Sequence, residues 1–304
     1  MWKTDGFKGK AMPPHRVTEH HGDTITANAI IRGAAEAAAD ETCGITMTQY
    51  FILVRLLACR EPEKMSDLSQ RLLIGQSTVT VAFGQLEERG AVARIPDGQD
   101  QRIVRTALLR EGVGIIDRVD LALAKSFKEF CGLLDERLLD VMLGRCAEVV
   151  EHYGLTRTSR GKVRYDTAFF ETAFLLHAQI ECGARECGLA VGEYRVLHYL
   201  STALQGERLG LIAQALAMRL NDVTNISKKL VARELANRVR DPADRRATVL
   251  EITSDGFAAV QEAAPIVSGY MRHLHRSDVD VLDAHGEIAH IFVENRRRLG
   301  PLAG

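Results

Sequence analysis

The feature that most constrains this chain is a match of the sequence to itself after a shift of 144 positions. The shift places residues 97–102 (DGQDQR) on residues 241–246 (DPADRR). An ungapped self-match that preserves apolar positions indicates one fold duplicated in tandem, and 304 residues suffice for about two domains. The residues that recur 144 positions later are Cys43, Gly44, Tyr50, Leu53, Gln70, Leu72, Val79, Thr80, Leu86, Arg89, Arg94 and Gly112.

Composition narrows the class of protein. Apolar residues make up 46% of the chain and charged residues 26%, which is typical of globular domains and excludes long disordered or collagen-like segments. No apolar run approaches the roughly 20 residues that span a bilayer, and the first residues do not read as a signal peptide. The six cysteines have no CxxC spacing, so we expect reduced thiols in a cytoplasmic protein that does not bind membranes.

The net charge of −1 argues against a nonspecific binder of polyanions, so any role with nucleic acid requires local basic patches. Hydrophobic spacing predicts the same elements in both copies. In the first copy they are a helix over 24–41, a helix capped by Thr48, a short helix over 65–72, a helix from Gln76 to Gly90, extended segments at 92–95 and 103–108, and long helices over 110–131 and 134–153.

These elements divide the chain into four parts. We predict a flexible N-terminal tail over 1–23, a first domain over 24–153, an exposed basic linker over 154–166 and a second domain over 167–300. Three short helices followed by a two-stranded hairpin make a winged helix-turn-helix, whose third helix enters the major groove of DNA. The predicted fold is therefore mainly α with small β-wings (α+β), a tandem duplication of a winged helix-turn-helix domain.

A family resemblance rests on a few segments of each copy. In the first copy they are 65–73, 76–90, the wing residues 100–102 and the helix that opens near Gly112; in the second they are Val223 with Thr224, 241–246 and 252–256. These segments resemble the MarR family of bacterial winged-helix regulators. Because members of that family are typically homodimers, the resemblance implies that this chain supplies both halves. We expect a monomer that forms an intramolecular pseudo-dimer with internal pseudo-two-fold symmetry.

The third helix and the wing carry the candidate contacts to a double-stranded DNA operator. An asparagine amide can pair with adenine, lysines neutralise phosphates, and an acid two residues before a wing arginine can orient its guanidinium. The weaker alternative is a solvated turn with an ion pair of little effect. The candidates are Ser77, Thr78, Thr80, Gln85, Arg102 and Arg105 in the first copy, and Asn221, Asp222, Thr224, Asn225, Lys228, Lys229, Arg245 and Arg246 in the second.

The two third helices differ, and the difference has a consequence for the operator. Val81 and Asn225 stand where the family usually has an arginine. Since the outward residues of the two copies cannot prefer the same bases, we expect a non-palindromic pair of half-sites dominated by the second copy.

The resemblance also implies a small phenolic or anionic effector. The candidate ligand-binding residues are Tyr50, His177 and Tyr194, although both tyrosines equally fit core positions repeated by the duplication. A thiol switch at Cys43 and Cys187 is disfavoured because neighbouring acids raise the pKa of a thiol.

Enzyme and metal motifs are not found. No phosphate loop, nucleophile elbow or HExxH occurs, and His273, His275, His285 and His290 lack a carboxylate or cysteine cluster, so we expect no catalytic residues, cofactor or metal. We predict a transcriptional repressor whose operator affinity a small molecule tunes. The alternatives are a winged-helix module that has lost DNA affinity and acts through a protein partner, and a ligand or thiol sensor with no DNA output.

Overall fold

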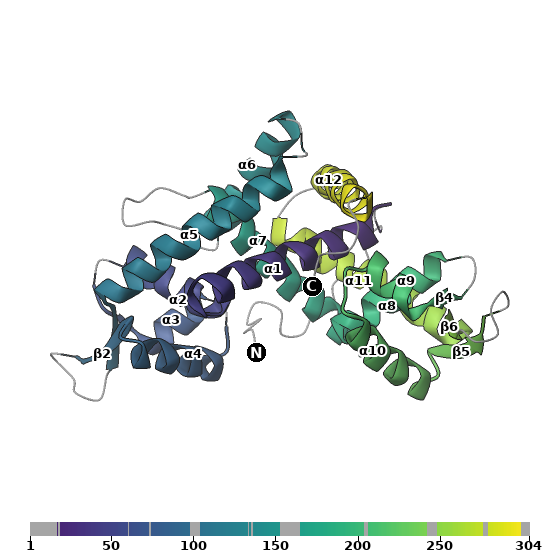
Figure 1. Cartoon of the computed structure of the whole chain (residues 1–304), viewed down its shortest axis with the longest axis horizontal. Helices are drawn as coiled ribbons and strands as arrows, with labels where there is room; N and C mark the ends of the chain where they lie inside the picture. Colours follow the sequence, from purple (N-terminus) through teal and green to yellow (C-terminus); the bar gives the residue numbers. More distant parts are fainter. Residues whose placement is uncertain are drawn as a thin grey trace. The chain divides into compact units, whose positions relative to one another are not determined.

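The computed structural model describes residues 17, 19–59, 61–72, 74–97, 104–132, 134, 136–152, 165–203, 206–241, 248–275 and 279–298. Within them one order of elements occurs twice (Figure 1). The first series is α1 (His21–Cys43), α2 (Met47–Ala58), β1 (Glu63–Lys64), α3 (Met65–Arg71), α4 (Gln76–Glu88), β2 (Val92–Pro96), β3 (Val104–Leu108), α5 (Arg110–Cys131) and α6 (Glu136–His152). The second is α7 (Tyr165–Glu186), α8 (Val191–Thr202), β4 (Glu207–Arg208), α9 (Leu209–Ala215), α10 (Leu220–Ala232), β5 (Ala236–Arg240), β6 (Thr248–Ile252), α11 (Ser254–His275) and α12 (Val279–Arg298).

Each series contains one three-stranded antiparallel sheet, ordered β1-β3-β2 and β4-β6-β5. In the first sheet Val92 pairs with Leu108, and in the second Ala236 pairs with Ile252. Both residues of the second pair lie 144 positions after those of the first, so strand register repeats with the sequence. The predicted wing hairpins are therefore confirmed in their strands, and the mainly helical α+β class with them.

Contacts divide the chain into two compact units, which are not the two series. The described residues of unit 1 lie within 31–174, and those of unit 2 lie within 11–30 and 175–304. The boundaries fall inside α1 and α7, so the first turns of α1 belong to unit 2 and the first turns of α7 belong to unit 1. The predicted domain ranges follow the repeat in the sequence, whereas contacts group residues across these two helices.

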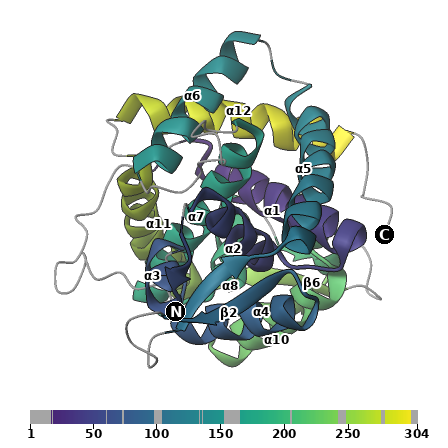
Figure 2. The same ribbon diagram turned by 90° about the vertical axis from the view of Figure 1, so that its left-hand side faces the viewer.

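In unit 1 the sheet lies beside α2 and α4 (Figure 2). Helix α4 buries Val79, Phe83 and Leu86, as its apolar spacing predicts, and the helix stops before Gly90. Gly90 has a φ of +68°, a left-handed conformation that costs glycine little and ends helices readily.

The start of α2 corrects one prediction. Thr46, not Thr48, caps this helix: its hydroxyl accepts the Gln49 N–H at 3.2 Å, and the Gln49 side chain accepts the Thr46 N–H at 2.9 Å. Thr48 lies inside the first turn. The reason is that a capping box needs a glutamine or glutamate three residues after the cap, and only Thr46 meets that spacing with Gln49.

Matched arginines that directly follow α4 and α10 bond to carbonyl oxygens at the ends of α1 and α7. Arg89 donates to the carbonyl oxygens of Cys43 at 2.7 Å and Gly44 at 2.6 Å. Arg233 donates to the carbonyl oxygen of Gly188 at 3.1 Å and to Glu193 at 2.8 Å. These recurring residues therefore act in the scaffold rather than in binding.

The remaining predictions on the termini and connections are only partly covered. Helix α1 begins at His21, so the last residues assigned to the tail are helical. Residues 1–16 and most of the linker lie outside the described residues. Among the helices that are described, none is both long and apolar enough to cross a bilayer.

Candidate nucleic-acid interface and ligand pocket

The outer face of α4 is polar but carries no cation. Ser77 and Thr78 are exposed, and Val81 has 63% of its surface exposed. Two of its polar side chains are already bonded: Thr80 donates to the Gln76 carbonyl oxygen at 2.8 Å, and Gln85 accepts from Gln49 at 2.8 Å. This face therefore offers short donors and an apolar methyl surface, and little charge for phosphates.

The outer face of α10 is different because it carries cations and free amides. Thr224 donates to the Leu220 carbonyl oxygen at 2.8 Å, as Thr80 does in α4. Asp222 is paired with Arg219 through contacts of 2.8 and 3.3 Å, so its negative charge is balanced. The predicted residues that lie exposed on this face are Asn221, Asn225, Lys228 and Lys229.

Arg219 was not among the predicted contacts. It directly precedes α10, and its side chain is 86% exposed despite the pairing with Asp222. A basic residue one position before a third helix, with an acid three residues later, was the signal that could have found it.

The wings are described only in their strands. Arg105 pairs with Asp97 and donates to the Pro62 carbonyl oxygen at 3.0 Å, which holds its guanidinium against the sheet edge. In the second wing Asp241 pairs instead with Arg208, at 2.6 Å. The predicted contacts Arg102, Arg245 and Arg246 lie outside the described residues.

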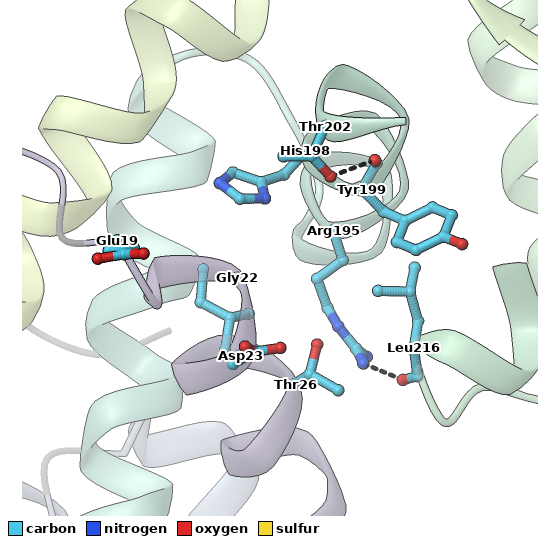
Figure 3. A pocket seen from close by; sticks show the side chains of 10 residues that line it. Glu19, Gly22, Asp23, Thr26, Arg195, His198, Tyr199, Thr202 and Leu216 are labelled. Carbon is cyan, nitrogen blue, oxygen red and sulfur yellow. Dashed lines mark hydrogen bonds between the residues drawn. The ribbon is translucent and has the colours of Figure 1, made fainter. Parts of the chain in front are cut away.

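Unit 2 contains a cavity of about 320 Å³, whose lining Figure 3 shows. The first turns of α1 form one wall and α8 the other, with Leu216 following α9. A cavity of this size fits a small organic molecule. Its lining residues are Glu19, Gly22, Asp23, Ile25, Thr26, Arg195, His198, Tyr199, Thr202 and Leu216.

Arg195 is the most distinctive group in this pocket. One of its terminal nitrogens donates to the Leu216 carbonyl oxygen (Figure 3), and burial lowers the pKa of the guanidinium to about 10, so it stays charged at neutral pH. Among the described residues, its buried Nε has no hydrogen-bond acceptor. A buried donor without a partner costs free energy, and an anionic ligand would supply the acceptor.

The predicted ligand residues lie elsewhere. Tyr194 is fully buried, and its hydroxyl lies 2.7 Å from Nε2 of His21. Burial, with His198 nearby, lowers the pKa of His21 to about 3, so this pair is neutral. Tyr50 is equally buried and donates to Asp120 at 2.5 Å. These positions fit the interpretation of both tyrosines as core residues.

His177 lines a separate cavity of about 560 Å³ in unit 2 that also contains Glu181 and Arg185. Those two side chains form an ion pair with each other, and both are substantially exposed. The structure therefore does not bring together Tyr50, His177 and Tyr194 as one ligand site.

Cys187, one of the two recurring thiols, is poorly suited to a redox switch. Burial, with Glu262 and Glu186 nearby, raises the pKa of Cys187 to about 11. The thiolate is the reactive form, so Cys187 is protonated and slow to react at neutral pH. Burial also raises the pKa of Cys131 and Cys146 to about 12.

The fold and the exposed third helices define a class of protein with winged helix-turn-helix units. Residues 45–104, from the residues before α2 to the start of β3, match the model of the MarR family. The match covers α4 and the wing strand β2. We call α4 and the equivalent α10 the recognition helices, because each is the third helix of its helix-turn-helix.

Two sequence relatives carry related descriptions. The HTH-type transcriptional regulator PrsX of Escherichia coli is 30% identical over 106 residues, which are 33% of this chain and 62% of PrsX. The uncharacterized HTH-type transcriptional regulator YkoM of Bacillus subtilis is 32% identical over 76 residues, 25% of this chain and 49% of YkoM. The chain thus spans less than two thirds of either relative.

Solved structures are also similar to part of the chain. The transcriptional regulator BldR from Sulfolobus solfataricus has 23% identity and a TM-score of 0.36, covering 42% of this chain and 91% of its own. CouR from Rhodococcus jostii, solved with p-coumaroyl-CoA, has 20% identity and a TM-score of 0.33, covering 36% of this chain and 76% of its own.

Proposed function

We propose that this protein is a DNA-binding transcriptional regulator with two MarR-type winged-helix lobes, produced by tandem duplication within one chain. The observation that carries the proposal is the MarR-family match over residues 45–104, which contain one recognition helix. The repeat of strand register at an offset of 144 residues supports a second lobe built on the same plan.

The two lobes contribute unequally to DNA binding in this proposal. Helix α10 exposes Lys228 and Lys229, and the exposed Arg219 directly precedes it, whereas α4 contains no Lys or Arg. Because cations neutralise phosphates and supply most nonspecific affinity, the second lobe dominates binding. Different outward residues then select a non-palindromic operator, which the chain contacts as a cytoplasmic monomer with pseudo-two-fold symmetry.

The proposed effector is a small organic anion bound in the pocket of unit 2. Arg195 supplies a buried positive charge with an unused Nε donor, and Ile25 and Leu216 supply apolar surface. The pocket joins the start of α1 to α8 and to the residue after α9, so an occupant bridges these elements. A ligand that binds one arrangement of the lobe better than another shifts its affinity for DNA.

The test is selection of genomic fragments by the full chain, starting with the DNA that flanks its own gene, followed by salt titration. We expect a preferred fragment and a linear fall of log affinity with log salt, with a slope of about −0.9 per neutralised phosphate. Fragment binding that is neither selective nor dependent on salt would reject a DNA-binding function.

That rejection would favour the second candidate, a module that acts through a protein partner. The observation behind it is the exposed face of α4, on which Val81 is 63% exposed and no cation is present. The two functions are separated by the salt titration, because an apolar protein contact does not release counterions as phosphate contacts do.

A further inference from the structure

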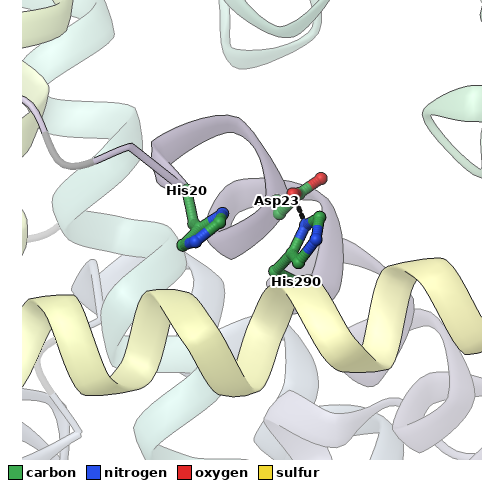
Figure 4. A group of neighbouring side chains, drawn as sticks. All are labelled: His20, Asp23 and His290. Carbon is green, nitrogen blue, oxygen red and sulfur yellow. Dashed lines mark hydrogen bonds and ion pairs between the residues drawn. The ribbon is translucent and has the colours of Figure 1, made fainter.

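Three potential metal ligands converge in unit 2. His20 precedes α1, Asp23 lies in its first turn, and His290 lies on α12 (Figure 4). Nδ1 of His290 is 2.7 Å from Oδ2 of Asp23, and the rings of His20 and His290 stack with centroids 4.5 Å apart. One ligand atom from each residue lies within 4.8 Å of the others.

We propose that His20, Asp23 and His290 bind one Zn²⁺ ion. Zinc takes imidazole nitrogens and carboxylate oxygens at about 2.0–2.2 Å, which places tetrahedral ligands about 3.3 Å apart. The ligand atoms lie within 4.8 Å of one another, and one N–O pair is only 2.7 Å apart, so their separations need to change by at most about 1.5 Å, which side-chain rotation can provide. Three protein ligands leave a fourth position for water.

The ligand types select the metal. Two imidazoles favour Zn²⁺ over Mg²⁺ and Ca²⁺, which prefer oxygen ligands alone. All three residues are partly exposed, so an ion can enter and lose its hydration shell in steps. In the absence of metal, Nδ1 of His290 and Oδ2 of Asp23 contact each other at 2.7 Å.

The ion would join two segments that lie far apart in the sequence. Asp23 and His290 are separated by 267 positions, so the site ties the start of α1 to α12 within unit 2. Asp23 also lines the pocket that contains Arg195, so a bound cation would add positive charge beside the proposed anion site. The metal site itself does not depend on the proposed function, since it requires neither DNA nor an effector.

The test is direct metal binding by the full chain after removal of metal with a chelator. Equilibrium dialysis against Zn²⁺ should give one tightly bound ion per chain, and Co²⁺ should give visible absorption bands that Zn²⁺ abolishes. Millimolar Mg²⁺ should not compete. His290→Ala should weaken binding more than about 100-fold, because loss of an outer-shell partner alone costs 10- to 100-fold. The control His273→Ala removes an exposed histidine of α11 outside the cluster and should bind as the parent chain does.

Asp23→Asn is the second variant, because an amide keeps a similar shape and a hydrogen-bond acceptor for His290 while losing the anionic ligand. Circular dichroism establishes that each variant is folded. Failure of the parent chain to bind one equivalent of Zn²⁺ would overturn the proposal, as would unchanged binding by folded Asp23→Asn. Either failure leaves the DNA titration unaffected, so the two proposals fail separately.

Discussion

Equivalent positions of the two units form a filled core in one and a polar pocket in the other. Arg195 of unit 2 corresponds, 144 positions earlier, to Phe51 of unit 1. Phe51 packs edge-on against Phe174, with ring centroids 5.2 Å apart. Likewise Thr26, which lines the pocket in unit 2, corresponds to the fully buried Phe170. A few exchanges between aromatic and polar residues at equivalent positions therefore distinguish the pocket of unit 2 from the packed aromatic residues of unit 1.

The buried charges differ in the same way. Unit 1 has a buried cation, Arg55, but a buried acid accompanies it, with Arg55 and Glu171 3.8 Å apart. Burial raises the pKa of Glu171 to about 7, against the opposing effect of Arg55. In unit 2 the half-buried Arg195 donates to a carbonyl oxygen, and its Nε, which is itself buried, has no acceptor among the described residues. The two arginines thus differ in the group that faces them: a buried carboxyl group lies near Arg55, whereas a backbone carbonyl oxygen accepts a hydrogen bond from Arg195.

The largest expected effect concerns the pair in unit 1. The pKa of Glu171 rises from 4.5 to about 7 on folding, so the folded chain holds a proton that the unfolded chain releases between these values. Its contribution to stability is therefore present below pH 4.5 and is lost as the pH rises through 7. We expect Glu171→Gln to gain about 3 kcal/mol over the parent chain between pH 4.5 and 8, measured by urea unfolding.

Glu129→Gln is the matched control, because this exposed glutamate of α5 lies in the same unit. Its difference from the parent chain should stay nearly constant with pH. If the free energy of unfolding of the parent chain and of Glu171→Gln changed with pH in the same way, burial would not raise the pKa of Glu171. The account of the buried pair in unit 1 would then be wrong.

The next effect concerns Arg195 in the pocket of unit 2. Arg195→Met should weaken binding of small aromatic and aliphatic carboxylates by about 1.5–3 kcal/mol, the usual contribution of a hydrogen bond to a charged group. Isothermal titration across a panel of such acids measures it. Arg185→Met removes an exposed, paired cation of the same unit and should leave affinity unchanged. Equal losses in both variants would indicate general charge attraction rather than a pocket.

The two recognition helices give the third comparison. Asn225→Ala should cost about 1–3 kcal/mol in operator binding and relax the preference at one position of one half-site. Val81→Ala, at the equivalent position of α4, should change little, because valine offers at most a contact with a thymine methyl group. Binding titrations against operators with one scrambled half-site measure both. Equal losses, or a palindromic preferred site, would remove the argument for unequal lobes.

The sequence predicted the elements well because helix and strand periodicity is local. Val79 and Phe83 are buried and the strands of both wings pair, as their spacing requires. The pocket could not be predicted, because it combines the start of α1 with α8, which are far apart in the sequence. One signal was present in the sequence. The self-match aligns the apolar Phe51 with Arg195, and a charged residue at a position that is apolar in the other copy indicates a polar environment there.

The cluster of His20, Asp23 and His290, which we propose binds zinc, was not predicted for a similar reason. His290 drew attention through neighbouring histidines on its own segment, whereas its partners His20 and Asp23 belong to the other end of the chain. The tyrosines had two interpretations from the sequence, a ligand site or a repeated core position. Tyr50 and Tyr194 recur with a polar tip, which fits a ligand site, but each hydroxyl has a buried partner from another helix. Long-range packing decides both cases, and spacing along the sequence does not contain it.

The smallest expected effect tests whether the two series are interchangeable at a position that touches no site. Thr46 and the equivalent Ala190 both precede a helix with extended backbone, but only Thr46 has a hydroxyl to accept an N–H. In both, the side chain three residues later accepts the cap N–H, at 2.9 Å from Gln49 and 3.1 Å from Glu193. We expect Thr46→Ala to lower the free energy of unfolding by about 1 kcal/mol and Ala190→Thr to raise it by a similar amount. Thr48→Ala, inside the first turn of α2, is the control and should cost less than Thr46→Ala. If Ala190→Thr destabilises the chain, the surroundings of Thr46 and Ala190 differ. The two series would then not be interchangeable at this position.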